Sequence, residues 1–350
     1  MQTIDADAHV IETLTTWSYM TKGEAKYRPI PVSGEAGEAD IVRNREQTDF
    51  WAIDGRLRPR ERNIGLDTSR EAREMSDIDG RIAHMNALGI DLQILYPSIF
   101  LRPLTRKQEV ELALVRSYNR WLAEIWRRGG GKLRWVAVPP VHSLVDPAIV
   151  REELSRAKAN GACGIFMCGF AADRELWDPY FYPLYEIAQD LDLPICLHAG
   201  VDSWAYHDLF EESDALAKFK FPVISAFHAL LYREIPQRFP AVRWGFIEAG
   251  SGWLLYVLSE LKNRMQRRGK RLSDRTLADN NMFVACQINE DLPTILHVAG
   301  EDSLVIGTDY GHNDNATQIE ALRQLRKAPA MPEGAVDKIL GDNPARLYGL

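Results

Sequence analysis

Cysteine is scarce in this sequence of 350 residues, and it has neither a long apolar run nor an excess of positive charge. Four cysteines, Cys163, Cys168, Cys196 and Cys286, are too few for a disulfide scaffold, and no two of them form a C-x-x-C pair. We therefore expect reduced cysteines buried in the core. The composition, 46% hydrophobic and 26% charged, is that of a globular protein with a large core.

The other two absences bear on location and partners. No stretch approaches the roughly 18 consecutive apolar residues of a spanning helix. Acidic Asp5 and Asp7 stand where a signal peptide would have a basic and then an apolar region. The formal net charge is −7, whereas nucleic-acid binders usually carry a basic domain or face. We expect a cytoplasmic protein that acts on a small molecule and binds neither membrane nor nucleic acid.

Short apolar runs alternate with amphipathic stretches almost from end to end, which is the pattern of repeated βα units around a parallel sheet. The rhythm predicts an α/β fold, with Asp146–Pro147, Asp178–Pro179 and a capping box of Thr105 with Gln108 as helix starts. The candidate strands are Thr3–Asp7, Asp91–Tyr96, Leu133–Val138, Gly164–Met167, Ile195–His198, Val242–Ile247, Met282–Cys286 and Leu304–Gly307.

One segment, from about Thr13 to Ser76, breaks this rhythm, because it is rich in charged and turn residues and has no clean period. We interpret it as an insertion after the first strand of a single domain that spans residues 1–350. A loop that follows a barrel strand lies over the barrel mouth, so the segment is predicted to act as a lid or as an oligomer contact. A separate domain bounded by linkers is the alternative.

The first strand carries acidic and imidazole side chains. It reads Ile4-Asp5-Ala6-Asp7-Ala8-His9, and side chains two apart on a strand point to the same face, so Asp7 and His9 project together. Acidic side chains are costly to bury unless they are paired or bound to a metal. Asp7 and His9 are therefore predicted metal ligands, with a carboxylate pair that accepts backbone hydrogen bonds as the alternative.

Two later strands end in the same residue types. His198 ends an apolar strand, where α/β barrels build their active sites. Asp309 follows the last candidate strand, and His312 and Asp314 lie in the next loop.

Asp7, His9, His198 and Asp309 come from three strands that converge only if the chain closes into a barrel. Their nitrogen and oxygen atoms suit Zn, Mn, Fe or Co, and the ligand types do not distinguish among these metals. A bound metal lowers the pKa of its water towards ~7 and creates hydroxide at neutral pH. Asp309 is then the candidate base that takes the proton from this water.

At this point the chain resembles a known family, the amidohydrolase superfamily, in the branch that contains aminocarboxymuconate-semialdehyde decarboxylase. The resemblance covers most of the chain. Beyond the metal strands it rests on residues 85–98, on residues 178–200 and on the closing run Gly341–Leu350. Each motif is modest by itself, and together they are specific.

The resemblance implies a (β/α)8 TIM barrel with a catalytic metal at its mouth. In the family the first strand usually supplies His-x-His, and some decarboxylases have a carboxylate in place of the first histidine. Asp7-Ala8-His9 is similar to this second form. His198 and Asp309 fall on the family's ligands from the fifth and eighth strands.

The sixth strand departs from the family's pattern. The branch usually has a histidine before glycine there, whereas this chain has Glu248 in Ile247-Glu248-Ala249-Gly250. The proton transfer that uses this histidine is therefore not available in the same form. A carboxylate can still move protons where burial raises its pKa, and it also bridges metal ions well. Glu248 with His312, and Glu12 as a further ligand, are candidates for a second ion.

Several other residues are candidates for catalysis or substrate binding. His228, in the helix before the sixth strand, is a candidate acid, base or ligand, with a structural histidine as the alternative. Arg174 is a candidate clamp for a substrate carboxylate, with a surface ion pair as the alternative. Trp253 and Tyr310 are predicted to form an apolar pocket wall, and His207 lies in a candidate substrate loop. The remaining histidines, His84, His142 and His297, are predicted to be structural.

Four functions are compatible with these residues. The first hypothesis is a metal-dependent hydrolase with Asp309 as base and Glu248 or His228 protonating the leaving group. Nonoxidative decarboxylation on the same scaffold is the alternative. The third hypothesis is an oxygenase component, because some relatives of the branch hold two Mn/Fe ions and have this activity, and Glu248 and His312 would suit a second ion. The fourth is a non-catalytic barrel that binds a partner protein. We also expect a homo-oligomer, or a heteromer with a related subunit.

Overall fold

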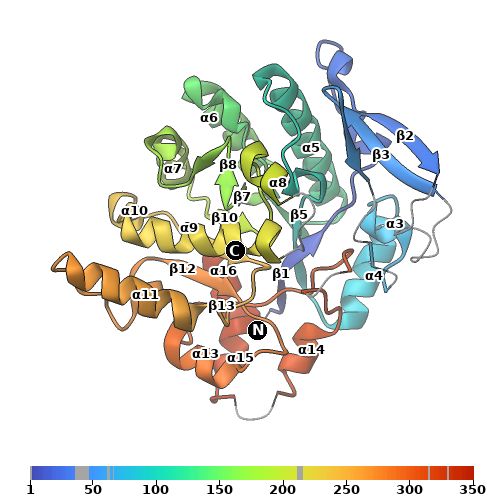
Figure 1. Cartoon of the computed structure of the whole chain (residues 1–350). Coiled ribbons are helices and arrows are strands. Elements are labelled where there is room, and N and C mark those ends of the chain that lie inside the picture. The colour runs from blue at the N-terminus through green and yellow to red at the C-terminus, as the bar shows by residue number, and fades with distance from the viewer. Residues whose placement is uncertain are drawn as a thin grey trace.

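A sheet of eight parallel strands forms the centre of the molecule (Figure 1). The computed structural model describes residues 2–35, 47–60, 64–65, 67–210, 216–313, 316–328 and 331–350. Along the sheet the strands are β1 (Ile4–His9), β5 (Leu92–Tyr96), β6 (Leu133–Ala137), β7 (Ala162–Cys168), β10 (Ile195–His198), β11 (Trp244–Ile247), β12 (Met282–Ala285) and β13 (Leu304–Val305). These are the eight strands predicted from the sequence, with small differences at their ends.

Backbone hydrogen bonds between the two ends of this sheet close it into a barrel. The Ala6 N–H donates to the Ile306 oxygen at 3.1 Å, and the Asp309 N–H donates to the Asp7 oxygen at 2.9 Å. Gly307 lies so close to β1 that a Cβ atom there would be 2.3 Å from the Asp7 Cβ. The close approach of the two strands therefore requires glycine. The predicted (β/α)8 barrel is confirmed.

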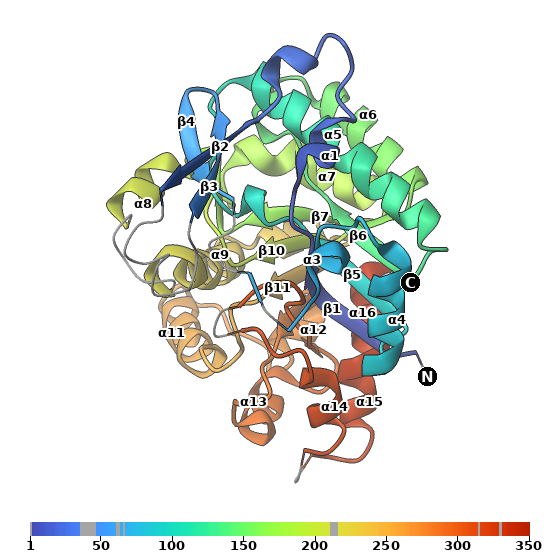
Figure 2. The ribbon, with the colours of Figure 1, turned by 90° about the vertical axis from the view of Figure 1, so that its right-hand side faces the viewer.

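Helices surround the barrel (Figures 1 and 2). The longer ones are α4 (Ile78–Leu88), α5 (Gln108–Arg128), α6 (Pro147–Ala159), α7 (Tyr182–Asp190), α9 (Phe221–Tyr232), α11 (Leu254–Arg267) and α13 (Leu292–Ala299). Shorter ones are α1 (Leu14–Trp17), α3 (Arg70–Arg73), α8 (Trp204–Leu209), α10 (Ile235–Arg238), α12 (Thr276–Asp279), α14 (Ala321–Leu325), α15 (Ala335–Asp337) and α16 (Asn343–Tyr348). The 3-10 turns are η1 (Ala25–Tyr27), η2 (Ile99–Leu101), η3 (Val141–Val145) and η4 (Pro179–Phe181), and η5 (Leu216–Lys220) and η6 (Lys338–Asp342) are π-helical.

The predicted helix starts are found at the two aspartate–proline pairs. The Asp146 side chain accepts a hydrogen bond from the Ala148 N–H at the start of α6. Asp178 likewise accepts one from the Tyr180 N–H at the start of η4. In both cases proline follows at the first helical position, where its missing N–H costs nothing.

The capping box predicted at Thr105 and Gln108 is wrong. Helix α5 begins at Gln108, and Lys107 stands at its N-cap without a side-chain cap. The Thr105 hydroxyl accepts the Lys107 N–H at 3.0 Å, but Thr105 lies two residues before the N-cap position, too early to cap the helix. The hydroxyl therefore stabilises the turn before α5.

Helix α16, which lies in the closing run Gly341–Leu350, packs against β1 and β13. The Tyr348 hydroxyl donates to the Ala6 oxygen at 2.8 Å and lies 2.7 Å from the Tyr96 hydroxyl. The Tyr96 ring centre in turn lies 4.9 Å from that of His198. The end of the chain therefore supports the side chains beneath the barrel mouth.

The segment between β1 and α4 contains a small antiparallel sheet. Its strands are β2 (Ile30–Glu35), β3 (Gln47–Ile53) and β4 (Arg56–Pro59). This sheet lies beside α8, the helix that follows β10 (Figure 2). The guanidinium carbons of Arg56 and Arg58 lie 4.1 and 4.6 Å from the ring centre of Trp204 in α8. A role as a lid or as an oligomer contact stays a prediction.

The cysteine prediction is confirmed, because all four cysteines are free and buried. Among the described residues, no helix is long and apolar enough to cross a lipid bilayer.

We expect Tyr348→Phe to lower the free energy of unfolding by about 1–2 kcal/mol, because the buried Ala6 carbonyl and Tyr96 hydroxyl lose a hydrogen-bond partner. Tyr256→Phe is the matched control, since Tyr256 is 75% exposed on α11. Chemical denaturation of both variants checks this. Equal stability of the two would show that α16 does not support the barrel in this way.

Candidate metal centre

Side chains with metal-binding atoms meet at the carboxyl ends of four barrel strands. They are Asp7 and His9 from β1, His198 at the end of β10, Glu248 after β11, and Asp309 and His312 after β13. All are buried, and none exposes more than 8% of its surface. The closed barrel thus brings these six predicted residues together, whereas Glu12 and His228, the two further candidates, belong to neither group described below. Asp314 lies outside the described residues.

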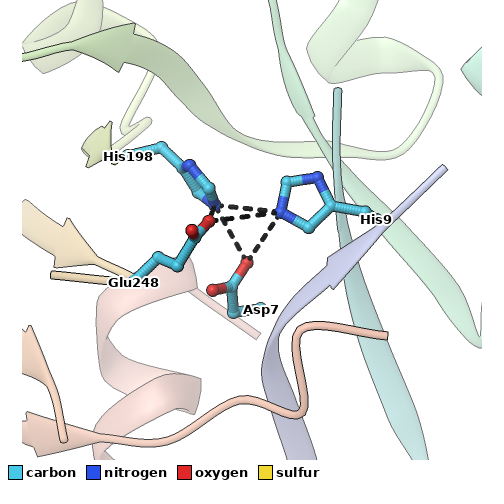
Figure 3. A group of neighbouring side chains, drawn as sticks. All are labelled: Asp7, His9, His198 and Glu248. Atoms are coloured by element: carbon cyan, nitrogen blue, oxygen red, sulfur yellow. Dashed lines mark hydrogen bonds and ion pairs between the residues drawn. The ribbon is translucent and has the colours of Figure 1, made fainter. Parts of the chain in front are cut away.

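A first group consists of Asp7, His9, His198 and Glu248, whose side chains point toward one another (Figure 3). The Nε2 atom of His198 lies 3.0 Å from Glu248 Oε2 and 3.2 Å from Asp7 Oδ1. It lies 3.1 Å from His9 Nε2. His9 Nε2 is 3.6 Å from Asp7 Oδ1 and 3.7 Å from Glu248 Oε2. These distances leave the ligand atoms around one small space.

The outer ring nitrogens show which atoms of this group carry protons. His9 Nδ1 lies 3.1 Å from the Pro97 oxygen, and His198 Nδ1 lies 3.0 Å from the Ala199 oxygen. A carbonyl only accepts, so each Nδ1 must donate its proton. Both Nε2 atoms of the neutral rings then carry lone pairs that face each other and two carboxylates. Acceptors repel unless a cation or a proton lies between them, and this donor set fits a divalent metal.

The pKa values of the two carboxylates in this group are shifted in opposite directions. Burial raises the pKa of Asp7. Burial acts most strongly on Glu248 and would raise its pKa, but His198 and His9 together outweigh burial and lower that pKa well below its usual value. A raised pKa, the condition under which Glu248 would move protons, is therefore not met here. Glu248 suits cation binding better than proton donation. When no cation is bound, Glu248 and Asp7 in turn outweigh burial and raise the pKa of His198 well above its usual value, so that a proton then takes the place of the cation.

A second group consists of His9, Glu248, Asp309 and His312, whose ligand atoms also lie within 4.8 Å of one another. His312 Nδ1 lies 3.0 Å from Asp309 Oδ1, and His9 Nε2 lies 3.4 Å from the same oxygen. The rings of His9 and His312 stack with their centres 3.7 Å apart. The structure thus places Glu248 with the first-group ligands where the sequence predicted Asp309, and it places Asp309 beside His312.

Two of the ligands have backbone conformations that L-residues rarely adopt. Glu248 has φ of +63° and Asp309 has φ of +52°. Such conformations cost about 1–3 kcal/mol each and persist where the surrounding fold imposes them. Glu248 directly follows β11, and Asp309 lies four residues after the end of β13, each at the turn where its carboxylate enters the site.

Asp5 lies outside both groups, although it shares the β1 sequence pattern. The strand register shifts between Asp5 and Ala8, which ends the simple alternation of faces. The Asp5 carboxylate instead accepts hydrogen bonds from the Thr308 N–H and hydroxyl and from the Gln93 side chain. Burial raises the pKa of Asp5 to about 6. Asp5 therefore stabilises the β1–β13 junction.

The substrate-binding candidates do not gather around the metal ligands. Arg174, on the short strand β9 (Arg174–Glu175), which pairs with β8 (Phe170–Ala171), is exposed and forms an ion pair with Asp178 at 3.3 Å. Tyr310 is fully buried, and its hydroxyl lies 2.9 Å from His84 Nδ1. Tyr310 thus holds α4 against the barrel. Trp253 packs on Phe227, with ring centres 4.9 Å apart, beside the turn that contains Glu248.

The remaining catalytic candidates also have other contacts. His228 lies in α9, half-buried, with its ring stacked on Tyr232 at 5.9 Å. It belongs to neither group of metal-binding residues, in keeping with the structural alternative. His207 lies in α8, 3.5 Å from Asp208 Oδ1. Glu12, the further ligand considered, accepts the Ser98 and Ile99 N–H groups and belongs to neither group.

A small cavity is lined by residues of η2, α5 and β7 and by the chain that follows β6, and Phe166 is its link to the first group. Its free volume is about 50 Å³, and its walls are mostly apolar, with Phe166, whose ring centre lies 6.3 Å from that of His198. Three charged residues, Arg102, Glu111 and Asp202, also line it. Burial raises the pKa of Asp202 to about 7 and that of Glu111 well above its usual value, and the charge of Asp202 adds to the shift of Glu111.

Sequence reasoning did not identify the residues that orient the ligands. The Ser98 hydroxyl lies 2.8 Å from His312 Nε2, and the Thr317 hydroxyl donates to Asp309 Oδ2 at 2.5 Å. The Arg81 guanidinium donates to the His9 backbone oxygen at 3.2 Å. The one available signal was the position of Ser98, which follows Pro97 directly after β5. A serine at such a position is too common to indicate a role.

We expect Asp7→Ala and His198→Ala each to abolish metal retention, because each removes a ligand atom from the centre of the first group. His297→Ala, an exposed histidine of α13, is expected to retain the metal of the wild type. Elemental analysis after expression with several transition metals measures this. The assignment fails if the three variants hold equal metal.

We also expect stability to depend on pH through the cavity carboxyls. Asp202, with its pKa of about 7, keeps a proton that the unfolded chain releases near pH 4. The free energy of unfolding is therefore expected to fall as pH rises from about 4 to about 7. Asp202→Asn is expected to reduce this fall, and the exposed control Asp190→Asn is not. Denaturation at several pH values tests it, and equal slopes for wild type and Asp202→Asn would contradict it.

Comparison with known proteins places this chain in a family. The Amidohydro_2 model, described as amidohydrolase, matches residues 4–350. No curated protein matches the chain. An amidohydrolase from Mycobacterium avium subsp. paratuberculosis is 19% identical, with a TM-score of 0.76, over 100% of this chain and 98% of that one.

Two further similar structures are decarboxylases. The 5-carboxyvanillate decarboxylase from Sphingomonas paucimobilis is 18% identical, with a TM-score of 0.69, over 100% of this chain and 99% of that one. The 5-carboxyvanillate decarboxylase from Novosphingobium aromaticivorans, solved with manganese and a nitrobenzoic acid, is 21% identical, with a TM-score of 0.65, over 78% and 81% of the two chains. Likeness at such identities shows a shared fold. Because the family model spans nearly the whole sequence, the chain belongs to the amidohydrolase family, as the resemblance predicted.

Proposed function

We propose that this chain is a metal-dependent decarboxylase that removes a carboxyl group from a small organic acid without consuming oxygen. The observation that carries the proposal is the buried first group, Asp7, His9, His198 and Glu248, with its facing lone pairs. The decarboxylase from Novosphingobium aromaticivorans, which shares the fold, was solved with manganese. Mn, Zn and Fe all suit this mixed donor set.

The residues of the first group have distinct tasks in this proposal. A divalent ion bound there would supply positive charge beside the substrate's oxygen atoms. Asp7 and Glu248 provide the negative charge that retains such an ion. His9 and His198 keep their Nε2 atoms inward because their Nδ1 atoms donate to the Pro97 and Ala199 oxygens.

Decarboxylation also needs a proton. The bond between the substrate carbon and its carboxylate breaks, carbon dioxide leaves, and the electron pair stays on the carbon, which then takes one proton. Asp309 is the proton carrier that we propose, because Glu248 is held ionised beside His198 and the Thr317 hydroxyl fixes one Asp309 oxygen. The second oxygen of Asp309 faces His9 at 3.4 Å.

We propose that the rest of such a substrate lies toward the apolar cavity next to Phe166. Its apolar wall includes Phe100, Val138 and Phe166, which suits an aromatic or otherwise apolar body. Arg102 lies in the same lining and favours an acid over a neutral compound. We therefore propose aromatic or unsaturated carboxylic acids as the substrate class.

We expect the manganese-loaded protein to release carbon dioxide from at least one acid in a panel of hydroxybenzoates that includes 5-carboxyvanillate, equally under air and under argon. Asp309→Asn is expected to lower kcat by about 10²-fold or more, the usual contribution of a positioned acid. Asp190→Asn, on the surface, is the control. Carbon dioxide release and oxygen uptake are measured together.

Other products would point to the competing functions. Oxygen uptake that depends on the acid would overturn the proposal and favour an oxygenase component. Release of an alcohol or an amine from a parallel panel of esters and amides, without carbon dioxide, would favour a hydrolase.

Hydrolysis is the second candidate, and a specific observation favours it. Two groups of ligands share His9 and Glu248, and neighbouring groups of this kind suit a pair of ions. Paired ions are a recurrent means of activating water against a scissile bond. In that reaction Asp309 would take the proton from the water instead of returning one to carbon.

A further inference from the structure

We propose that Glu290 is a positioning residue, which fixes the loop between β11 and α11 and thereby holds the Glu248 carboxylate among the ligands of the first group. Glu290 itself belongs to neither group of metal-binding residues. Its effect is on cation binding, which the proposed function also requires, and its role is the same whichever reaction the centre catalyses.

The Glu290 side chain reaches from the chain between β12 and α13 to the loop that follows Glu248. Its Oε1 atom accepts the Ser251 and Gly252 N–H groups, each at 2.7 Å. Its Oε2 atom accepts the Ser251 hydroxyl at 2.6 Å and the Gln287 N–H at 2.8 Å. A carboxylate oxygen has two lone pairs, so both oxygens of Glu290 use their full capacity as acceptors. Most of these bonds go to the loop and not to the part of the chain that carries Glu290.

Two glycines of the loop allow the carboxylate to approach the backbone this closely. Gly250 has φ of +70°, and a Cβ atom there would lie 3.0 Å from Glu290 Oε1. A Cβ atom at Gly252 would lie 3.4 Å from the same oxygen. A larger residue at Gly250 would therefore be strained in its backbone and crowded against Glu290. The sequence Gly250-Ser251-Gly252 thus suits a loop that is bound by a carboxylate.

The loop is fixed on both sides of Glu248. On one side the Ile247 oxygen accepts a backbone N–H from the chain after β10 at 3.1 Å, which holds the end of β11. On the other side Glu290 holds the N–H and the hydroxyl of Ser251. Only residues 248–250 lie between these two anchors. The left-handed backbone of Glu248, with φ of +63°, is therefore imposed from both ends.

The backbone conformation of Glu248 decides where its carboxylate lies. In this conformation Glu248 Oε2 lies 3.0 Å from His198 Nε2 and points toward the other ligands of the first group (Figure 3). L-residues favour negative φ, so a loop without its second anchor would relax toward negative φ and move the carboxylate. Glu290 thus prepares one ligand of the centre, and its loss is expected to weaken cation binding.

A purely structural role is the competing explanation, because Glu290 also lies at the N-terminus of α11, where a carboxylate stabilises the first N–H groups. That role predicts a loss of stability alone, whereas positioning predicts a loss of metal affinity as well. The neighbouring Asp291 provides the matched control. It accepts the Thr294 N–H at 3.3 Å and the Thr294 hydroxyl at 2.7 Å at the start of α13, and so stabilises a different helix.

The experiment measures metal affinity and does not use turnover. The metal-free chain is titrated with Mn²⁺, and free and bound ion are measured by electron paramagnetic resonance. We expect Glu290→Ala to weaken Mn²⁺ binding by about 10–100-fold, the usual effect of removing a residue that orients a metal ligand. Glu290→Gln keeps an oxygen for the Ser251 and Gly252 N–H groups and is expected to restore most of the affinity. Asp291→Ala is expected to lose stability, as a lost helix cap does, and to keep the affinity of the wild type.

A double-mutant cycle tests whether Glu290 acts through Glu248. In a chain that carries Glu248→Ala, the further change Glu290→Ala is expected to cause no additional loss of affinity, because the side chain that it positions is absent. Ser251→Ala is a milder variant for the case in which Glu290→Ala does not fold. It removes one of the bonds to Glu290 and is expected to weaken Mn²⁺ binding by a smaller factor.

Three results would overturn the positioning role. They are wild-type affinity in both Glu290→Ala and Ser251→Ala, an equal loss from Glu290→Ala with and without the Glu248 side chain, and a loss of the same size in Asp291→Ala. A wild-type chain that binds no Mn²⁺ would overturn the metal centre of the proposed function as well. Affinities that follow the expected order in a protein that releases no carbon dioxide would support the role of Glu290 and count only against decarboxylation.

Discussion

Mutual repulsion between lone pairs is the constraint on which the barrel mouth depends. Two imidazole nitrogens and two carboxylate oxygens lie 3.0–3.7 Å apart in a buried space. Such acceptors hold together only around positive charge, so the fold must keep them in place until a cation binds. The orienting contacts do this: carbonyl oxygens fix the outer nitrogens of His9 and His198, and hydroxyls fix His312 and Asp309.

The pairing of β1 with the chain after β13 maintains this arrangement. It places Asp7 beside Asp309 through a backbone hydrogen bond and requires Gly307 for the close approach. Asp5 stabilises the same junction through Thr308, and Tyr348 reaches it from α16. A site built on the closure of the barrel is therefore coupled to the stability of the whole fold, since no single βα unit contains the ligands of either group.

Family membership and local chemistry answer different questions about this protein. Membership accounts for the barrel and for metal ligands at its mouth, and decarboxylases are among the chains with the same fold. Barrels host many reactions, so the reaction must follow from the site. Here Glu248 replaces a histidine that the family resemblance led us to expect, and its ionised carboxylate lies between two groups of ligands. Neither the fold nor the ligand set therefore decides the reaction, which has to be identified from its products.

The sequence by itself determined the eight strands and the chemical types of the ligands, because both follow from local patterns: alternation of apolar runs, and Asp, His or Glu where a strand ends. It could not determine that Asp5 turns away at a register shift, or that Arg174 and Tyr310 make contacts away from the centre. Only the tertiary structure decided that Glu248 joins Asp7, His9 and His198 while Asp309 lies beside His312. That grouping depends on distances between side chains from opposite ends of the chain, and these are set by how the barrel closes.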